Sequence, residues 1–210
     1  MKPVKAILFE PVGCLAEFPA APFEEIASRV LCRESNPARS GSRSYWHVLS
    51  LIETSHWAQA EVFELQAAAA ASVYEDVTPA FAELRSMHVD LALASSLSRA
   101  AVTHFIDRAG LRGFFSAVWD RETAGGVGAV PIRQALAATG VSPDQVMYLT
   151  DTADGLKAAR AVGVQAVLMM NDPDEAQRLS LQGPAGGIVS LHELPDFLRL
   201  LNFGDRLHNP

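Results

Sequence analysis

The stretch VMYLTDTADGLKAARAVGVQAVLMM, from Val146 to Met170, decides the fold of this chain. VMYLT is predicted to be a short buried strand, and the residues from Asp154 to Val162 are predicted to form a helix that Gly163 ends. QAVLMM is then predicted to be a second strand. A strand, a helix of about ten residues and another strand make a βαβ unit, whose two strands are parallel and buried on both faces.

The same alternation continues through most of the chain beyond residue 76. Strands are predicted there over Asp90–Ser95, Phe114–Trp119 and the GIVS segment, and helices over Val77–His88, Ser98–Ala109, the PIRQALAATG segment, Asp174–Leu181 and Leu191–Leu201. One more strand is predicted near the N-terminus, over Ala6–Phe9. Thr78 is expected to cap the first of these helices, with Pro79 at its first position. This alternation predicts an α/β fold with a parallel sheet that helices cover on both faces.

Residues 18–75 are an exception, because no strand is predicted in them. Three helices are predicted there, over Phe23–Cys32, Ser44–His56 and Ala58–Tyr74, and a polar segment rich in Ser, Pro and Gly joins the first two. We expect residues 18–75 to form a small helical cap, and residues 1–17 and 76–210 to form the core domain. Inserts of this kind lie over the site at the strand ends.

The composition indicates an ordinary globular protein. The chain has 210 residues, of which 49% are hydrophobic, and a net charge of −7. No apolar run is long enough to span a membrane, and the run after Lys5 stops at Glu10, too soon for a signal peptide. The acidic balance argues against a nucleic-acid partner, and two cysteines fit reduced thiols. We therefore expect a cytoplasmic protein that binds neither nucleic acid nor membranes.

Polar side chains follow three of the predicted strands, at the edge of the sheet where ligands bind in open α/β folds. Glu10 follows the first strand, Ser95 and Ser96 follow the second, and Asp151 and Asp154 follow VMYLT. Two carboxylates brought together there, with backbone carbonyls, would suit Mg²⁺. The alternative is that these residues are polar only because loops face water. Their common position under a cap favours a site.

Several segments resemble the haloacid dehalogenase-like hydrolase superfamily, in the subgroup with a helical cap after the first strand: AILFEPVGCLAE, DLALASS and QALAATGVSPDQVMYLTDTADGLKAARAVGVQAVLM. The resemblance spans nearly the whole chain and implies a Rossmann-like core. It also implies a nucleophilic Asp at position 10, an acid/base Asp at position 12 and a phosphate ligand at Ser95. A lysine ahead of a later helix and a Mg²⁺ site that begins at Asp151 complete the implied machinery.

This chain departs from that pattern at the positions that carry the chemistry. The nucleophile position is Glu10, the acid/base position is Val12 and the lysine position is Val130. No lysine lies between residues 6 and 156. The second acidic position of the metal loop is Gly155, with Asp154 one residue before it.

These departures predict the loss of ordinary phosphatase and dehalogenase turnover. Glu is one methylene longer than Asp, and an error of about 1 Å in placing a reacting group can cost roughly 10²-fold in rate. Valine cannot transfer a proton, and general acid–base catalysis contributes about 10²- to 10⁴-fold. Arg121 or Arg133 is a candidate replacement for the lysine, although a guanidinium differs from an ammonium in size and geometry.

Three functions follow as alternatives. The first is a non-hydrolytic protein that binds a small molecule, such as a phosphorylated one, or a protein partner. The second is a Mg²⁺-dependent phosphoric-monoester hydrolase with Glu10 as nucleophile, and the third is a dimer partner whose cap around Trp46 and Trp57 forms an interface. We expect a monomer or homodimer, with Mg²⁺ or no cofactor. The expected substrate-binding residues are Ser95, Ser96, Arg121 and Arg133, and the expected metal ligands are Glu10, Asp151 and Asp154.

Overall fold

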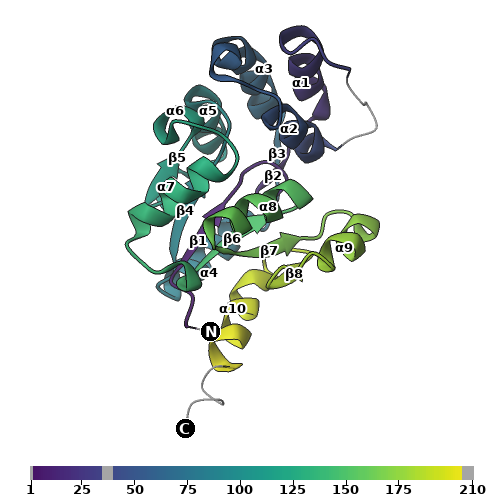
Figure 1. Cartoon of the computed structure of the whole chain (residues 1–210). Coiled ribbons are helices and arrows are strands. Elements are labelled where there is room, and N and C mark those ends of the chain that lie inside the picture. Colours follow the sequence, from purple (N-terminus) through teal and green to yellow (C-terminus); the bar gives the residue numbers. More distant parts are fainter. Residues whose placement is uncertain (1, 35–39, 205–210) are drawn as a thin grey trace.

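The computed structural model describes residues 2–34 and 40–204. Its centre is a six-stranded parallel sheet with the strand order β5-β4-β1-β6-β7-β8 (Figure 1). The strands are β1 (Ala6–Phe9), β4 (Asp90–Ala94), β5 (Ala117–Trp119), β6 (Val146–Thr150), β7 (Gln165–Met169) and β8 (Gly186–Ile188). The predicted α/β fold with a Rossmann-like parallel sheet is confirmed.

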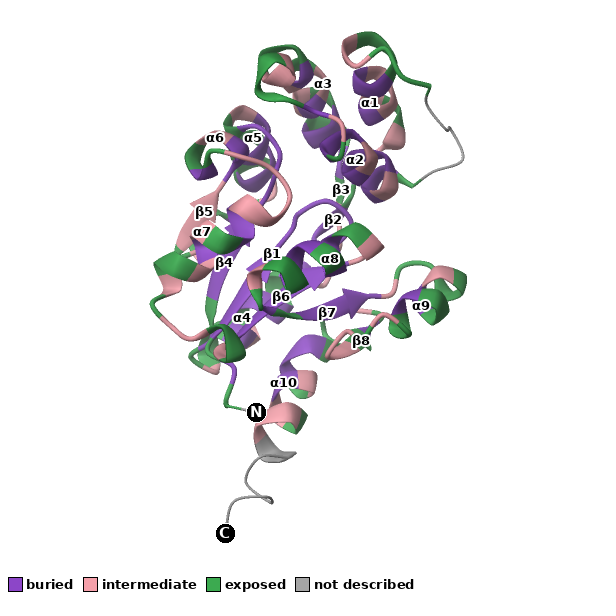
Figure 2. Ribbon diagram, viewed as in Figure 1, coloured by how far each residue is buried: buried purple, intermediate pink, exposed green. Residues whose placement is uncertain are grey.

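Helices cover this sheet in two layers. On one face α7 packs beside α8, and on the other α4 packs beside α10 (Figure 1). The core helices are α4 (Val77–Ser86), α5 (Arg99–Arg108), α6 (Arg121–Ala124), α7 (Ala129–Thr139), α8 (Ala153–Val162), α9 (Pro173–Ser180) and α10 (Glu193–Gly204), with short 3₁₀ turns at Arg112–Phe114 and Pro143–Gln145. Figure 2 shows that burial is concentrated in the central strands and on the inner sides of the helices.

The segment after β1 forms a helical cap at one end of the sheet (Figure 1). It contains α1 (Ala20–Glu25), which continues as a π-helical turn at Ile26–Val30, then α2 (Gly41–Leu49), a 3₁₀ turn at Thr54–His56 and α3 (Trp57–Ala70). A two-stranded antiparallel ladder lies at the base of the cap, where β2 (Ala16–Glu17) pairs with β3 (Ser72–Val73).

Three local expectations are wrong. The segment 18–74 does contain a strand, because α3 ends at the extended residue Ala71 and the backbone that follows pairs with β2. Helix α2 ends at Leu49 and not at His56. Helix α4 begins at Val77, after Asp76 and not after Thr78; the Asp76 carboxylate accepts hydrogen bonds from Ser190 and from the backbone of Leu191.

A buried ion pair joins the cap to the core. Glu64 on α3 and Arg121, the first residue of α6, lie 2.7 Å apart between Oε1 and Nη1, and their side chains are 2% and 0% exposed. Glu64 also accepts a hydrogen bond from the backbone of Ser98 at 3.0 Å, and the Arg121 guanidinium stacks over Trp57 at 5.1 Å. Such a pair is costly to break, because either charge alone would remain buried without compensation.

Arg121→Met is therefore expected to destabilise the protein by about 3–5 kcal/mol, because it leaves the Glu64 carboxylate buried without its cation. Adding Glu64→Gln, which removes that charge but keeps an acceptor for Ser98, should recover most of the loss. Urea unfolding of the wild type, both single variants and the double variant measures this. Equal stability of Arg121→Met and the double variant would contradict the interpretation.

Gly155 lies in the first turn of α8 against Thr150, the last residue of β6. A β-carbon at Gly155 would overlap the Thr150 hydroxyl. The position at which related proteins are expected to carry an acidic residue therefore has no room for a side chain here. The absence of a carboxylate at residue 155 is part of how β6 and α8 pack.

Gly155→Ala should lower the unfolding free energy by about 1–3 kcal/mol through this overlap, although alanine is the better helix former elsewhere. Gly113→Ala is a suitable control, because a β-carbon there meets nothing within 4 Å. Adding Thr150→Ala removes the hydroxyl, which is the closest contact, but keeps the β-carbon of residue 150, so it should recover only part of the loss in the Gly155 variant. Thermal unfolding that is unchanged by Gly155→Ala would contradict the packing argument.

Candidate functional site

The carboxyl ends of β4, β1 and β6 lie side by side and bring three of the predicted site residues to one edge of the sheet. In the register of the ladders, Phe9 of β1 pairs with Leu93 of β4 and with Leu149 of β6. The next residues along these strands lead into the loops that carry Glu10, Ser95 and Asp151. The parallel topology is thus what assembles the site.

Glu10 is buried at this edge, with 1% of its surface exposed. Its Oε1 accepts a hydrogen bond from Ser95 Oγ at 2.9 Å, and its Oε2 accepts one from the Tyr45 hydroxyl at 3.2 Å. The structure thus brings Glu10 and Ser95 together, as expected. Both carboxylate oxygens are occupied by side chains of the protein itself.

Tyr45 reaches this site from helix α2 of the cap. Its hydroxyl accepts a hydrogen bond from the backbone N–H of Ser96 at 2.9 Å, and Ser95 Oγ lies 3.5 Å away. The ring is fixed by Phe23 and Trp46, at centroid distances of 5.3 and 5.9 Å. The Tyr45 hydroxyl therefore occupies the Ser96 N–H and lies against the Ser95 hydroxyl, the groups at the end of β4 with which a ligand would form hydrogen bonds.

Ser96 lies in the loop after β4, next to Ser95, but its side chain contacts the loop before α7. Its Oγ accepts a hydrogen bond from the backbone N–H of Gly128 at 2.8 Å. Gly128 directly precedes helix α7, whose second residue is Val130 at the expected lysine position. The loop that would carry the lysine is thus tied to the end of β4 through backbone and hydroxyl groups.

Burial dominates the ionisation of Glu10. It raises the pKa of the carboxyl from 4.5 to about 8, although the hydrogen bonds from Ser95 and Tyr45 act in the opposite direction. At pH 7 the protonated form therefore predominates. Burial also raises the pKa of the neighbouring Cys14 thiol well above its ordinary value. Cys14 is fully buried beside Glu10 and Asp151.

Asp151 follows β6 and lies against the backbone of Gly13. Its Oδ2 accepts hydrogen bonds from Ser42 Oγ at 2.5 Å and from Asn171 Nδ2 at 3.4 Å. Asn171 also donates to the Gly13 carbonyl at 2.6 Å. A β-carbon at Gly13, where φ is +79°, would overlap the Asp151 carboxylate, so glycine is needed there.

Half of the Asp151 carboxylate has no hydrogen-bond partner. Within the described part of the chain, its Oδ1 is covered and nothing donates to it. Burial raises the pKa of this carboxyl from 3.8 to about 6. An unpaired buried oxygen is costly, because it has lost its hydrogen bonds to water without gaining one from the protein.

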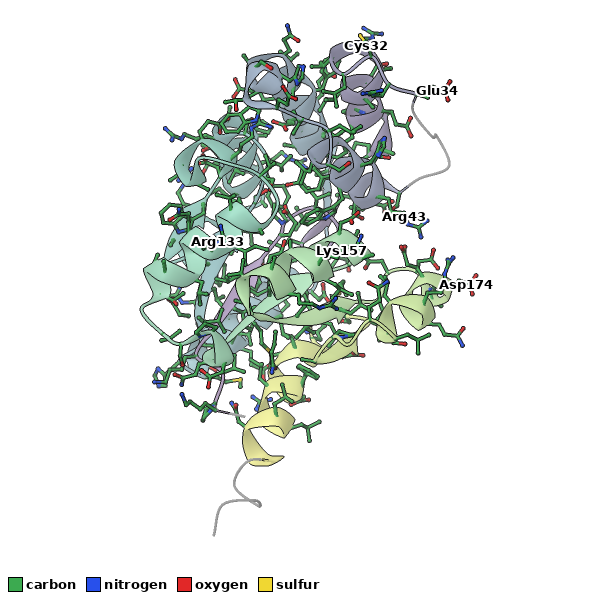
Figure 3. The ribbon with its side chains drawn as sticks, in the orientation of Figure 1. Cys32, Glu34, Arg43, Arg133, Lys157 and Asp174 are labelled. Atoms are coloured by element: carbon green, nitrogen blue, oxygen red, sulfur yellow. The ribbon has the colours of Figure 1, made fainter. Side chains whose placement is uncertain are left out.

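A pocket of about 340 Å³ opens beside Asp151, between α2 of the cap and the segment that joins β7 to α9. Ser42 and Arg43 line it from the cap, and Asp151 and Asn171 line it from the core. Arg43 points from α2 towards α9 (Figure 3), where its Nε donates to Glu175 at 2.8 Å. Glu10 does not line this pocket.

The remaining predicted site residues lie elsewhere. Asp154 is exposed on α8 and bound to Lys157 at 2.8 Å. Arg133 is exposed on α7 (Figure 3), and Arg121 is held in the buried pair with Glu64. Among the described residues, neither arginine has a hydrogen bond or ion pair with Glu10 or Asp151, because Arg121 serves cap packing and Arg133 faces solvent.

The arrangement does not fit a Mg²⁺ ion held jointly by Glu10, Asp151 and Asp154. Glu10 is engaged by Ser95 and Tyr45, and Asp154 faces Lys157. Of the Asp151 oxygens, Oδ2 accepts from Ser42 and Oδ1 is covered. Within residues 2–34 and 40–204, no three Asp, Glu, His or Cys side chains are grouped to hold a metal ion. Mg²⁺ demands near-octahedral oxygen coordination.

Sequence reasoning missed several residues that shape this site. Asn171 follows the carboxyl end of β7, so the strand-end argument that identified Asp151 also applied to it. Tyr45, Ser42 and Arg43 lie on a cap helix, and the helical pattern does not indicate which of its polar residues face the core.

No helix in the described part of the chain is long and apolar enough to cross a membrane.

Comparisons with known proteins agree with this architecture. The family model "Haloacid dehalogenase-like hydrolase" matches residues 40–169. A phosphoglycolate phosphatase from Synechococcus elongatus is 36% identical over 102 residues, which are 47% of this chain and 46% of that protein. The matched part thus spans about half the length of this relative.

Solved structures with the same fold include enzymes of different activity. A haloacid dehalogenase-like hydrolase from Streptococcus pneumoniae superposes with a TM-score of 0.68 at 16% identity, covering 92% of this chain and 98% of that one. The L-2-haloacid dehalogenase from Xanthobacter autotrophicus gives 0.63 at 17% identity, covering 93% and 98%. Together with the strand order, the cap and the family match, these findings show that the chain belongs to the haloacid dehalogenase-like hydrolase family.

Proposed function

We propose that this chain is a non-hydrolytic member of its family that binds a small molecule in the pocket beside Asp151. The observation that carries the proposal is the position of Tyr45. Its hydroxyl lies between Glu10, Ser95 and the backbone of Ser96, at 3.2, 3.5 and 2.9 Å. A phosphoryl group would have to displace this side chain and the cap helix that carries it before it could approach Glu10.

The chemistry at Glu10 supports the same conclusion. A protonated carboxyl is a poor nucleophile, and a pKa of about 8 keeps Glu10 largely protonated at pH 7. Val12, at the expected acid/base position, is fully buried and apolar. In-line attack, proton transfer and charge neutralisation each lack the group that would perform them.

The second candidate is a Mg²⁺-dependent phosphoric-monoester hydrolase with altered machinery. It is favoured by the partial match to a phosphoglycolate phosphatase. It requires Glu10 to be released from Ser95 and Tyr45 in an open state of the cap. The interface function built on Trp46 and Trp57 has less support, because Trp46 is 5% exposed and Trp57 covers Arg121.

Hydrolysis of an aryl phosphate, with and without Mg²⁺, separates these candidates. We expect no turnover above background from the wild type or from Glu10→Ala. Glu10→Asp with Val12→Asp and Tyr45→Phe shortens the carboxylate at position 10, supplies the missing one at position 12 and removes the obstructing hydroxyl, so any gain of activity should appear there first. Mg²⁺-dependent turnover by the wild type that Glu10→Ala abolishes would overturn the proposal.

The raised pKa of Glu10 also predicts how stability depends on pH. The folded protein keeps the Glu10 proton up to about pH 8, whereas the unfolded chain loses it near 4.5. The stability of the wild type should therefore fall as the pH rises through this interval. Glu10→Gln cannot ionise, so its stability relative to the wild type should increase by roughly 3–5 kcal/mol between pH 4.5 and pH 8.

Urea unfolding at several pH values measures this difference. Asp90→Asn is a matched control for the loss of one carboxylate, because Asp90 is exposed at the opposite end of the sheet. Parallel stability curves for the wild type and Glu10→Gln would show that Glu10 ionises normally in the folded protein.

A further inference from the structure

The outward side of helix α3 is uncharged and largely apolar. Helix α3 lies in the cap and packs against α1 and α5 on its buried side (Figure 1). No charged residue is exposed within Trp57–Ala70, all of which the structure describes. The exposed positions are Ala58, Gln59, Val62, Gln66, Ala69 and Ala70. A helix that is apolar on all sides is normally buried on all sides, so the outward side of α3 lacks a partner within the described part of the chain.

The spacing of the apolar residues on this side indicates what the partner is. The four residues that follow one another along it are Ala58, Val62, Leu65 and Ala69. They are four, three and four residues apart, which is the spacing of a seam between two packed helices. The stripe reads small, large, large, small from either end. An antiparallel second α3 would therefore place Ala58 opposite Ala69 and Val62 opposite Leu65, and a two-fold axis would repeat both contacts.

The charges beside the stripe are complementary between two copies. A groove of about 760 Å³ between α3 and α5 borders the stripe at Leu65, and both Glu61 and Arg108 line it. Arg108 donates to the Ala71 carbonyl, and neither Glu61 nor Arg108 has an ion-pair partner among the described residues. A two-fold axis perpendicular to both α3 helices keeps the two α5 helices on the same side, so Glu61 of each copy can approach Arg108 of the other.

We propose that the protein forms a homodimer in which the α3 helices of two copies pack antiparallel through Ala58, Val62, Leu65 and Ala69. This surface differs from the one predicted around Trp46 and Trp57. It also lies outside the pocket beside Asp151, so the inference does not depend on the proposed function. A seam built on one pair of helices is small for a protein interface, so the dimer is expected to dissociate in the micromolar range.

Sedimentation velocity of the full-length chain over a series of concentrations tests for the dimer. The mass should rise from that of the 22.6 kDa monomer towards twice that value as the concentration increases. A Kd of about 1–100 μM is expected for an interface of this size. A monomer throughout a series that reaches about 300 μM would overturn the proposal, because a dimer in that range would then predominate.

Two matched variants locate the interface. Val62 is 56% exposed in the single chain, so Val62→Glu should leave the fold intact while it places two carboxylates near the two-fold axis. It should raise the Kd of the dimer at least about tenfold. Val189→Glu is the control, because Val189 is 60% exposed and follows strand β8, away from α3 (Figure 1). A dimer that Val62→Glu leaves unchanged, or that both variants weaken equally, would contradict the proposal.

Disulfide cross-linking tests the antiparallel direction of the two helices. Cys32→Ser first removes the exposed thiol, and Ala58→Cys and Ala69→Cys are then made separately in that background. Oxidation of an equimolar mixture with copper phenanthroline should yield a covalent dimer of the two variants. Each variant alone should yield at least about fivefold less, because equivalent residues would lie roughly 16 Å apart along the helices, too far for a disulfide. Equal or greater cross-linking of either variant with itself would overturn the antiparallel arrangement.

Discussion

A buried carboxyl group at the end of the central strand is the constraint on which this site depends. β1 lies between β4 and β6, so the residue that follows it enters the protein interior. Glu10 has no access to water there and needs donors from the protein. Ser95 supplies one from the neighbouring strand end, and Tyr45 supplies the other from the cap. Satisfying this one group thus holds α2 down over the edge of the sheet.

Tyr45 also determines where a ligand has room to bind. With Tyr45 in place, the closed region lies at Glu10 and the open region lies at Asp151. The ion pair of Glu64 with Arg121 holds α3 against the core, and Arg43 with Glu175 joins α2 to α9. The cap is therefore fixed at three places, of which the one at Arg43 borders the pocket and is the most exposed to solvent.

Much of the fold and part of the site could be predicted from the sequence, for identifiable reasons. Alternating strands and helices set the parallel sheet, and a parallel sheet brings Glu10, Ser95 and Asp151 to one edge whatever their roles. The direction of the Asp154 side chain was harder to predict, because a shift of one helical position turns a side chain by about 100° around the helix. In the structure Asp154 faces Lys157. Arg121 is near the expected lysine in sequence, but its partner Glu64 lies 57 residues earlier, a pairing no local pattern reveals.

The family fold carries dehalogenase and phosphatase members, so the architecture alone does not select a reaction. The reaction depends on the charge of the side chains at the strand ends and on whether a substrate can reach them. A hydrolase of this family needs a reachable carboxylate and a cation to offset the anionic substrate. Here the carboxyl of Glu10 is covered and largely neutral, and the reachable pocket is lined by carboxylates with one arginine already paired. The proposed non-hydrolytic function rests on these differences and on Val12 and Val130, which stand where the resemblance implies an acid/base carboxyl and a lysine and cannot stabilise a phosphoryl transition state.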